Sequence, residues 1–373
     1  MSRPGSDLRH VVVGCGGLGS AAAYWLSRAM GGRVLALEQH ALGGSAHDAR
    51  PVHLLQHHDA DAALAPAAYA TWRDVERVSG LPLLTETGGL VIADDAARRR
   101  IGRLAAVADR HDVDFELLDP RALRRRWPQF RVTGTEDALH QRRSGIVDAA
   151  RAGATHLALA RGHGAEIREH SPVRALRATP SHVEVVLDDE VIRAERVVVA
   201  ADVGTTEVLD GLGGLSLTVA REQVTSYATP HLLDFSSARF PVFTWHGADD
   251  VSGIGVHGEV ATTLGQHGAG DGPLRRRREE FLAEHVPGFA GPEIATRSRL
   301  SAVPSDGHHV IGAVPGEPRV AVGVGARPEA TFTSLIGRIL AELATTGSSR
   351  HPIGAFALDR PALAAPSRWR SHA

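Results

Sequence analysis

One short segment near the start of the chain, Gly14–Gly19, constrains the fold more than any other. It reads GCGGLG and follows the β-branched run His10–Val13. The alanine-rich stretch Ser20–Arg28 comes next, and a second apolar run, Val34–Leu37, ends in the acid Glu38. Strand, glycine turn, helix, strand and acid in this order are typical of the first unit of a parallel α/β sheet.

Each part of this unit has a separate task in binding a dinucleotide. The glycines allow a tight turn and let the backbone approach a pyrophosphate, while the helix N-terminus offers free N–H groups. The acid, Glu38, is placed to accept hydrogen bonds from a ribose diol and to repel a 2′-phosphate. We therefore expect the nucleotide to be bound by Gly14, Gly16, Gly17, Leu18, Gly19, Glu38 and Gln39.

The chain beyond residue 40 departs from the strict alternation of strands and helices that a nicotinamide enzyme usually shows. A helix is predicted around Ala60–Ser79, and Leu83–Ile92 is predicted to form paired strands around a turn. Far downstream, Ala194–Asp202 is predicted as a buried strand that returns to the nucleotide region. This order favours a flavin fold assembled from separate segments, although an NAD-dependent dehydrogenase remains an alternative.

The composition excludes several classes of function. The chain has 41 basic and 43 acidic side chains and a formal charge of −2, so bulk electrostatics give no argument for binding nucleic acid or an anionic membrane. All basic side chains are arginine, which excludes Schiff-base and P-loop lysine chemistry. The only cysteine, Cys15, lies in the glycine turn and is expected to be a small packing residue. With no signal-peptide pattern and no apolar run of about 18 residues, we expect a soluble, cytoplasmic protein.

Nearly the whole chain resembles the D-amino-acid-oxidase-like flavoproteins, most closely the branch of monomeric sarcosine oxidase and N-methyltryptophan oxidase. The resemblance is carried in order by the nucleotide unit, Gly44 and Ser45 followed by Arg50, Thr85–Ile92, Leu118–Pro128, Ser144–Val147, Gly164–Val173 and Pro304–Gly312. It implies an α/β fold with an α+β second domain. It also implies oxidation of a C–N bond by hydride transfer to flavin N5, with FAD as the cofactor.

The resemblance also implies how the chain divides. A Rossmann-like FAD-binding domain is expected from the discontinuous residues 1–80, 145–215 and 295–363. A substrate domain with a mixed β-sheet is expected from residues 81–144 and 216–294, and residues 364–373 are expected to form a mobile tail.

The departures from the family pattern fall at positions that contact the flavin or the substrate in that family. The position of the cysteine that often carries FAD falls at about Arg299 here, between Ser298 and Leu300, so FAD is expected to be held noncovalently. The family lysine near N5 is replaced by a residue near Thr263, and the lysine that pairs with the substrate carboxylate by Thr331. The assisting arginine is His53, and two framing aromatic residues become small or aliphatic near Ile254 and Ser301. A simple N-methyl amino acid is therefore not the expected substrate.

The resemblance gives a set of site residues. The catalytic candidates are Arg50, His267 and His53. The structural alternative is a salt bridge for Arg50 and a hydrogen-bonded structural histidine for His267, while His53 stands where the family has a substrate-binding cation. Arg327 is either a charge beside the flavin or an exposed loop arginine. The further cofactor-binding candidates are Gly44, Ser45, Arg50, Val173, Ala201, Gly325, Arg327 and Thr331. No metal is expected, because adjacent histidines such as His57 and His58 diverge in both strands and helices.

These expectations describe an FAD-dependent oxidoreductase that converts a secondary amine, or a related C–N or N–N bond of an amino-acid-derived molecule, to an imine. Without a lysine near N5, direct reaction with oxygen is expected to be slow, as in a dehydrogenase. A redox-inactive binding or scaffold subunit is the main alternative. The partner is expected to be a small-molecule amine, with no nucleic acid or membrane and with a monomer as a plausible state.

Overall fold

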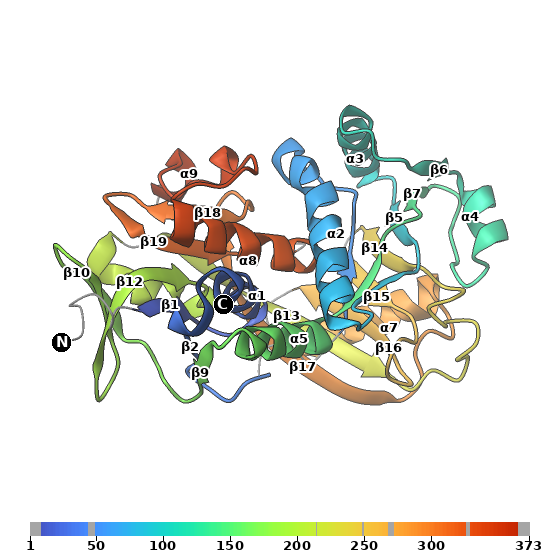
Figure 1. The fold of residues 1–373 in the computed structure, drawn as a ribbon. Helices are drawn as coiled ribbons and strands as arrows, with labels where there is room; N and C mark the ends of the chain where they lie inside the picture. The colour runs from blue at the N-terminus through green and yellow to red at the C-terminus, as the bar shows by residue number, and fades with distance from the viewer. Residues whose placement is uncertain are drawn as a thin grey trace.

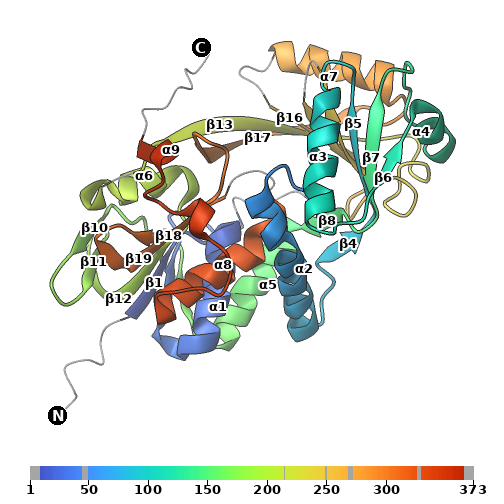
Figure 2. The same cartoon turned by 90° about the horizontal axis from the view of Figure 1, so that it is seen from above.

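The strand that leads into the glycine turn, β1 (Arg9–Val13), lies inside a parallel sheet between β2 (Val34–Leu37) and β12 (Val191–Val199). Beyond β2 lies β9 (Glu166–Arg168), and the end of β12 pairs in parallel with β19 (Glu317–Val324). The computed structural model describes residues 9–43, 49–213, 215–247, 250–267, 272–325 and 329–364. Segments from the start, middle and end of the chain thus lie side by side in one sheet (Figures 1 and 2).

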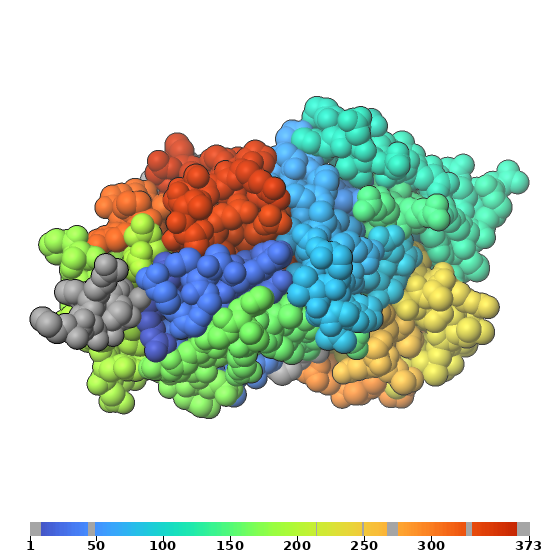
Figure 3. All heavy atoms as spheres, viewed as in Figure 1, coloured from blue at the N-terminus to red at the C-terminus, as the bar shows by residue number. Residues whose placement is uncertain are grey.

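Both faces of this sheet are buried, because successive residues of its strands point to opposite sides. Val12 and Ala36 pack against the helices, whereas Val11 and Leu35 pack on the other face. The helical layer consists of α1 (Gly17–Met30), α5 (Ala149–Gly162) and α8 (Glu329–Thr346), which form neighbouring bands in Figure 3. The sheet is extended by β10 (Ala175–Ala178), β11 (Val183–Val186) and β18 (Val310–Val314).

A second sheet of eight strands forms the other half of the molecule (Figure 2). It is mixed, because β14 and β5 run parallel while the other pairs are antiparallel. Its order is β17 (Glu293–Pro304), β13 (Leu217–Tyr227), β16 (Thr262–His267), β15 (Val251–Ile254), β14 (Val242–His246), β5 (Gly89–Ala93), β7 (Asp137–Gln141) and β6 (Glu116–Leu118). Edge-to-face rings of Phe235, Phe240, Phe243 and Phe289 fill its core. Its helices are α3 (Arg98–Arg110), α4 (Pro120–Arg126) and α7 (Gly272–His285).

The prediction that Leu83–Ile92 forms one pair of strands is wrong. The first strand, β4 (Leu84–Glu86), pairs with β8 (Gly145–Asp148), which also pairs with β3 (Ala49–Val52) in a small third sheet. The second strand, β5, belongs to the mixed sheet instead. Gly88, with φ of +77°, turns the chain between them, so that the two strands separate rather than fold back on each other.

The other predicted elements are confirmed with shifted ends. The long helix α2 (Asp59–Ser79) packs on α8, and β12 begins at Val191 rather than at Ala194. Short elements complete the described chain: η1 (Gly31–Arg33), η2 (Asp202–Gly204), α6 (Thr205–Val208), η3 (Asp210–Leu212), η4 (Gly354–Phe356) and α9 (Pro361–Ala364). The expected fold class, a discontinuous Rossmann-like unit plus a mixed sheet, is confirmed. Within the described residues, no helix is both long and apolar enough to cross a membrane.

Candidate active site

The glycine turn is a place where only glycine fits. Gly14 has φ of +91°, and a Cβ there would lie 2.4 Å from the carbonyl oxygen of Ala200, which directly follows β12. A Cβ on Gly19 would lie 1.9 Å from the oxygen of Gly14. The first glycine therefore closes the turn and the last lets α1 pack on it, as the sequence pattern predicted. The start of α1 has no side-chain cap, so its first N–H groups are available to a pyrophosphate.

The acid at the end of β2 is tied to the same turn. One oxygen of Glu38 accepts a hydrogen bond from the backbone N–H of Cys15 at 2.8 Å, and the other accepts one from His40 at 3.0 Å. A carboxylate offers about four acceptor positions, so lone pairs remain for a ribose diol. Cys15 itself is buried, and burial followed by the nearby Glu38 charge raises the pKa of its thiol to about 12. The thiol is therefore a packing group rather than a nucleophile at neutral pH.

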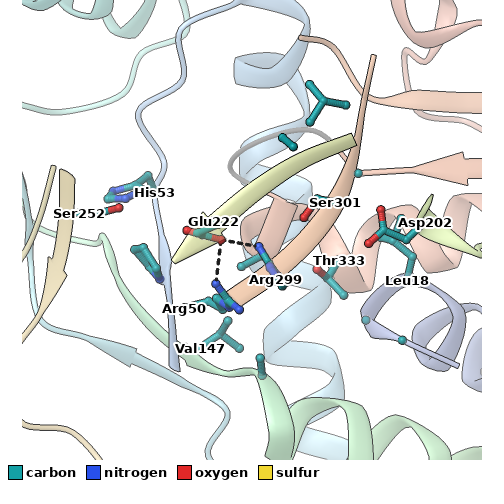
Figure 4. A pocket seen from close by; sticks show the side chains of 18 of the residues that line it. Leu18, Arg50, His53, Val147, Asp202, Glu222, Ser252, Arg299, Ser301 and Thr333 are labelled. Atoms are coloured by element: carbon teal, nitrogen blue, oxygen red, sulfur yellow. Dashed lines mark hydrogen bonds and ion pairs between the residues drawn. The ribbon is translucent and has the colours of Figure 1, made fainter. Parts of the chain in front are cut away.

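A cavity of about 380 Å³ extends from the glycine turn to the mixed sheet. Gly16, Gly17 and Leu18 line its nucleotide end, whereas His53 and Ser252 lie together at its far end (Figure 4). Its further lining includes Arg50, Trp72, Val147, His156, Ala200, Asp202, Glu222, Thr244, His246, Arg299, Ser301, Gly325, Ala330 and Thr333. A backbone cradle that opens into a mainly apolar cavity fits a dinucleotide with a planar ring system.

Three charged side chains meet in the middle of this cavity (Figure 4). A single oxygen of Glu222 lies 3.3 Å from Nη1 of Arg50 and 3.0 Å from Nη2 of Arg299. The side chains of Arg50 and Glu222 are 12% and 11% exposed, and that of Arg299 is 34% exposed. Two guanidinium groups against one carboxylate leave this cluster with a net charge of about +1 in a partly desolvated site.

The strand register brings these residues together. In the antiparallel pairing of β13 with its two neighbours, Glu222 lies opposite Arg299 on β17 and opposite His267 on β16. Directly opposite residues of antiparallel strands project to the same face. Arg50 approaches from β3, a different sheet. The cluster therefore depends on contacts between residues 172 and 77 positions apart.

His53 is packed at the far end of the cavity. Its backbone N–H donates to Oγ1 of Thr331 at 3.0 Å, and its carbonyl accepts from the side chain of Gln56 at 2.6 Å. Burial, with a smaller contribution from His57, lowers the pKa of His53 to about 4. The imidazole is therefore neutral at physiological pH and can accept a proton or a hydrogen bond.

A second group of imidazoles lies beside His53. His57 and His246 both line the cavity, with ring centroids 5.9 Å apart. Burial, then the nearby His246, lowers the pKa of His57 to about 4. Nδ1 of His246 lies 3.2 Å from Asp250. Although burial acts to raise the pKa of Asp250, hydrogen bonds from His246 and Arg100 lower it to about 2.

The residues predicted as site residues are distributed unevenly. Gly16, Gly17, Leu18, Arg50, His53 and Gly325 line the cavity, while Gly14 and Gly19 shape the turn beneath it. Gln39 is exposed, and Val173 and Ala201 are half-buried against the far face of the parallel sheet. Gly44, Ser45 and Arg327 lie outside the described residues, and of His267 only the backbone is described. The assignments of Gln39, Val173, Ala201 and these four remain predictions.

Thr331 takes a different position from the one expected of a flavin contact. It is fully buried at the start of α8, its hydroxyl accepts the His53 N–H, and its carbonyl accepts from the indole of Trp72 at 3.1 Å. Ala330 and Thr333, its neighbours, line the cavity instead. The cofactor role of Thr331 therefore stays a prediction, whereas its structural role is to hold His53.

Sequence reasoning missed Glu222, Ser252 and Thr244 as site residues. Glu222 stands in an ordinary strand pattern, Leu217–Tyr227, where a single acid carries no signal of its own. Only the strand order, which places β13 beside β17, identifies it. Within the described part of the chain, no group of three or more His, Cys, Asp or Glu side chains could hold a metal ion.

Comparison with known proteins identifies the family. Residues 9–343 match the family of FAD dependent oxidoreductases. Monomeric sarcosine oxidase of Streptomyces avermitilis is 29% identical over 372 residues, which cover 93% of this chain and 96% of that protein. N-methyl-L-tryptophan oxidase of Yersinia pestis is 27% identical, with coverage of 95% and 99%.

Solved structures of flavoenzymes have the same fold as this chain. The open form of a variant of NikD, described as an unusual amino acid oxidase essential for nikkomycin biosynthesis, superposes with a TM-score of 0.83 at 25% identity. That match covers 94% of this chain and 97% of the NikD chain. L-proline dehydrogenase from P. horikoshii has the same TM-score at 16% identity, covers 94% of this chain and 96% of its own, and supports the fold alone. The match over most of the chain, together with the glycine cradle and the cavity beside it, establishes that this protein belongs to the FAD dependent oxidoreductase family and that FAD is its cofactor.

Proposed function

We propose that this enzyme oxidises a C–N bond of an amino-acid-derived secondary amine to an imine, with FAD held noncovalently. The single observation that carries the proposal is the cavity that joins the glycine turn to the Arg50–Glu222–Arg299 cluster. When bound, FAD supplies the acceptor for the electron pair that leaves the C–H bond of such a substrate. The protein's own residues then bind the substrate, orient it and receive the amine proton.

Residues of the turn would hold the nucleotide. Gly16 and Gly17 offer backbone N–H groups at the start of α1, and Glu38 offers free lone pairs to a ribose. A cysteinyl link is not available, because the only cysteine, Cys15, is buried in the turn and the family position of the linked cysteine is Arg299. Noncovalent binding follows from these residues.

The charge of the cavity supports a carboxylate on the substrate. Thr331 and His53 replace the two cations of the family, and Thr331 is fully buried with its hydroxyl occupied. Arg299 provides a different guanidinium, one-third exposed in the cavity, which donates a hydrogen bond to Glu222. A planar guanidinium in a partly desolvated cavity is well suited to bind a carboxylate.

The neutral imidazole of His53 supports an amine as the reacting group. An oxidisable amine must reach the site with its lone pair free, so a neighbouring base that accepts its proton favours the reaction. With a pKa of about 4, His53 is unprotonated at neutral pH and has an acceptor nitrogen. His267, whose backbone lies opposite Glu222, is the second candidate for this task.

The same proposal retains the predicted division of the chain. Residues 1–80, 145–215 and 295–363 would form the FAD-binding domain, since all strands of the parallel sheet and its extension fall in these ranges. Residues 81–144 and 216–294 would form the substrate domain, which contains the mixed sheet except for most of β17. The proposed state is a cytoplasmic monomer that acts on a small molecule.

An absorbance spectrum of the purified protein, followed by anaerobic bleaching with a panel of amines, tests the proposal. We expect a yellow protein that releases its flavin on denaturation and that is bleached by secondary amines with a carboxylate. A colourless protein that refuses added FAD would support a redox-inactive scaffold instead. Oxygen consumption compared with dye reduction tests the acceptor: we expect faster dye reduction, because no lysine stands near the flavin.

A further inference from the structure

A second cavity, of about 370 Å³, lies next to the active site. It is formed where the start of α2 faces α3, and neither the glycine turn nor the charged cluster contributes to it. Its lining residues are His57, His58, Asp59, Ala60, Arg103, Ala106, Val107, Arg110 and His308. Several of these, including Ala106 and Arg103, are exposed, so this cavity opens to solvent.

The two cavities share one lining residue. His57 lines both of them. Gln56, which precedes His57, and Leu104 line the active-site cavity. His58, which follows His57, and Arg103 line the second cavity. Among the described residues, His57 is therefore the only one common to both linings.

The second cavity carries a positive charge at its mouth. Asp59, the only acid of its lining, is bound by Arg110 through two hydrogen bonds of 2.9 and 3.0 Å, and His111 lies 3.1 Å away. Arg103, by contrast, makes no ion pair or hydrogen bond with the described residues. Cavities lined by one sign of charge raise the local concentration of ions of the opposite sign.

The junction between the cavities is uncharged. Burial, followed by the neighbouring His246, holds the pKa of His57 at about 4, so its ring is neutral at physiological pH. A neutral ring between the two cavities presents no charge of its own to an anion that moves inward. Beside it, Arg100 and Asp250 form an ion pair with each other and both contact His246, so their charges offset. Farther into the cavity, the Arg50–Glu222–Arg299 cluster again leaves a net positive charge.

From these observations we propose that the second cavity is the entrance to the active site, that His57 stands at its inner end, and that the entrance favours substrates with an anionic group such as a carboxylate. This inference rests on the proposed function for its chemistry. Its geometry can be tested without any turnover.

The test uses the single-cysteine character of the chain. Cys15 is buried and its thiol has a pKa of about 12, so a cysteine introduced at Ser252, at the far end of the active-site cavity, is the reactive one. The FAD-loaded Ser252→Cys protein is treated with the anionic reagent sulfonatoethyl methanethiosulfonate, and labelling is followed by mass spectrometry. The wild-type chain under the same conditions gives the background from Cys15.

Blocking the entrance tests the route. Ala106→Trp places a large ring in the second cavity, whereas Asp109→Trp places the same ring on an exposed position of α3 that lines neither cavity. We expect Ala106→Trp to slow labelling of Cys at position 252 by about tenfold or more and Asp109→Trp to leave it within about twofold of the parent. Equal labelling rates in both variants would overturn the proposal. An unchanged flavin spectrum and unfolding midpoint in Ala106→Trp shows that the fold is intact.

Charge at the mouth is tested with a matched pair of arginines. Arg103 lines the second cavity, whereas Arg99, on the same helix, is exposed and lines neither cavity. We expect Arg103→Gln to lower the ratio of anionic to cationic reagent labelling (sulfonatoethyl against trimethylammonium-ethyl) by about threefold or more at low salt, and Arg99→Gln to leave it unchanged. A ratio that both variants change equally would refute anion selection at this entrance. These labelling results are independent of whether an amine bleaches the flavin, so failure of the proposed function is recognised separately.

Discussion

The glycine turn and the charged cluster are held together by different kinds of contact. In the turn, the backbone makes the decisive contacts: Gly14 and Gly19 leave no space for a Cβ, and Glu38 binds main-chain N–H groups. In the cluster, side chains from two sheets meet: Arg50 comes from the small sheet, and Glu222 and Arg299 come from the mixed sheet. Backbone contacts tolerate little change in sequence, whereas a side-chain cluster can be rebuilt with other residues. This difference would account for a glycine pattern that matches the family beside a pocket that is predicted to depart from it.

The largest effect is expected from a single methyl group in the turn. Gly19→Ala would place a Cβ 1.9 Å from the oxygen of Gly14, so α1 would have to move away from the turn. We expect a loss of more than about 3 kcal/mol in the free energy of unfolding, and loss of FAD. Urea unfolding and the visible absorbance of bound flavin measure both.

The matched control is Gly102→Ala, on the exposed face of α3, where a Cβ would meet nothing within 4 Å. It should raise the free energy of unfolding by about 0.5–1 kcal/mol, since alanine is the better helix former. A Gly19→Ala protein as stable as the wild type would refute the claim that close backbone packing holds α1 against the glycine turn.

In the charged cluster, the neutral substitution Glu222→Gln should have the next largest effect. It removes the carboxylate that contacts both Arg50 and Arg299 and leaves two guanidinium groups near each other. Because Arg299 is one-third exposed, we expect a loss of about 2–3 kcal/mol, below the figure for a fully buried pair. Chemical denaturation of Glu280→Gln, which breaks an exposed pair with Arg276, should show less than about 0.5 kcal/mol. Similar losses in the two variants would show that the cluster is not a stabilising feature.

The pH dependence of the free energy of unfolding tests the burial of His156, which lines the cavity from α5. Burial lowers its pKa to about 3, below the ordinary value of 6.5, so the unfolded chain binds this proton first as the pH falls. The stability contribution is therefore complete above pH 6.5 and decreases by roughly 1.4 kcal/mol per pH unit below it. His156→Gln, which can still bond to Ser334, should flatten the pH dependence of unfolding by about one proton relative to the wild type. Identical slopes in the variant and the wild type would contradict the assignment.

The smallest effect is expected from Thr331→Val. The substitution removes the hydroxyl that accepts the backbone N–H of His53, at almost constant volume. Loss of one buried hydrogen bond predicts a destabilisation of about 1–2 kcal/mol in thermal or urea unfolding. Thr346→Val, at the exposed end of α8, should cost less than about 0.5 kcal/mol. If Thr331→Val lowers the turnover of amines although the protein stays folded, the position of the His53 side chain affects the reaction.

The parts of the fold that could be predicted from the sequence are those with a local cause. The β-branched run His10–Val13 predicts β1, the apolar run Val34–Leu37 predicts β2, and the glycines predict the turn between β1 and α1. Strand pairing has no such local cause. Residues 83–92 look like a hairpin, yet β4 and β5 find partners that lie far away in the chain.

The same reasoning applies to the site. Arg50 could be predicted because it follows a recognisable motif at a fixed distance. Glu222 could not, because its role exists only once β13 and β17 lie in register with Arg299 opposite it. The entrance residues at the start of α2 were equally hidden, since His57 and Arg103 come together only through the packing of α2 near α3.

The two long strands β13 and β17 have a mechanical consequence. They pair without interruption from Leu217 to Ser226, and they carry Glu222 and Arg299 directly opposite each other. A ribbon of this length bends or tilts as a unit, so its two opposed charges travel together. Relative motion of the two sheets would therefore change the distance between this pair and Arg50, which belongs to another sheet. The ion pair between Glu222 and Arg299 would remain formed during that motion.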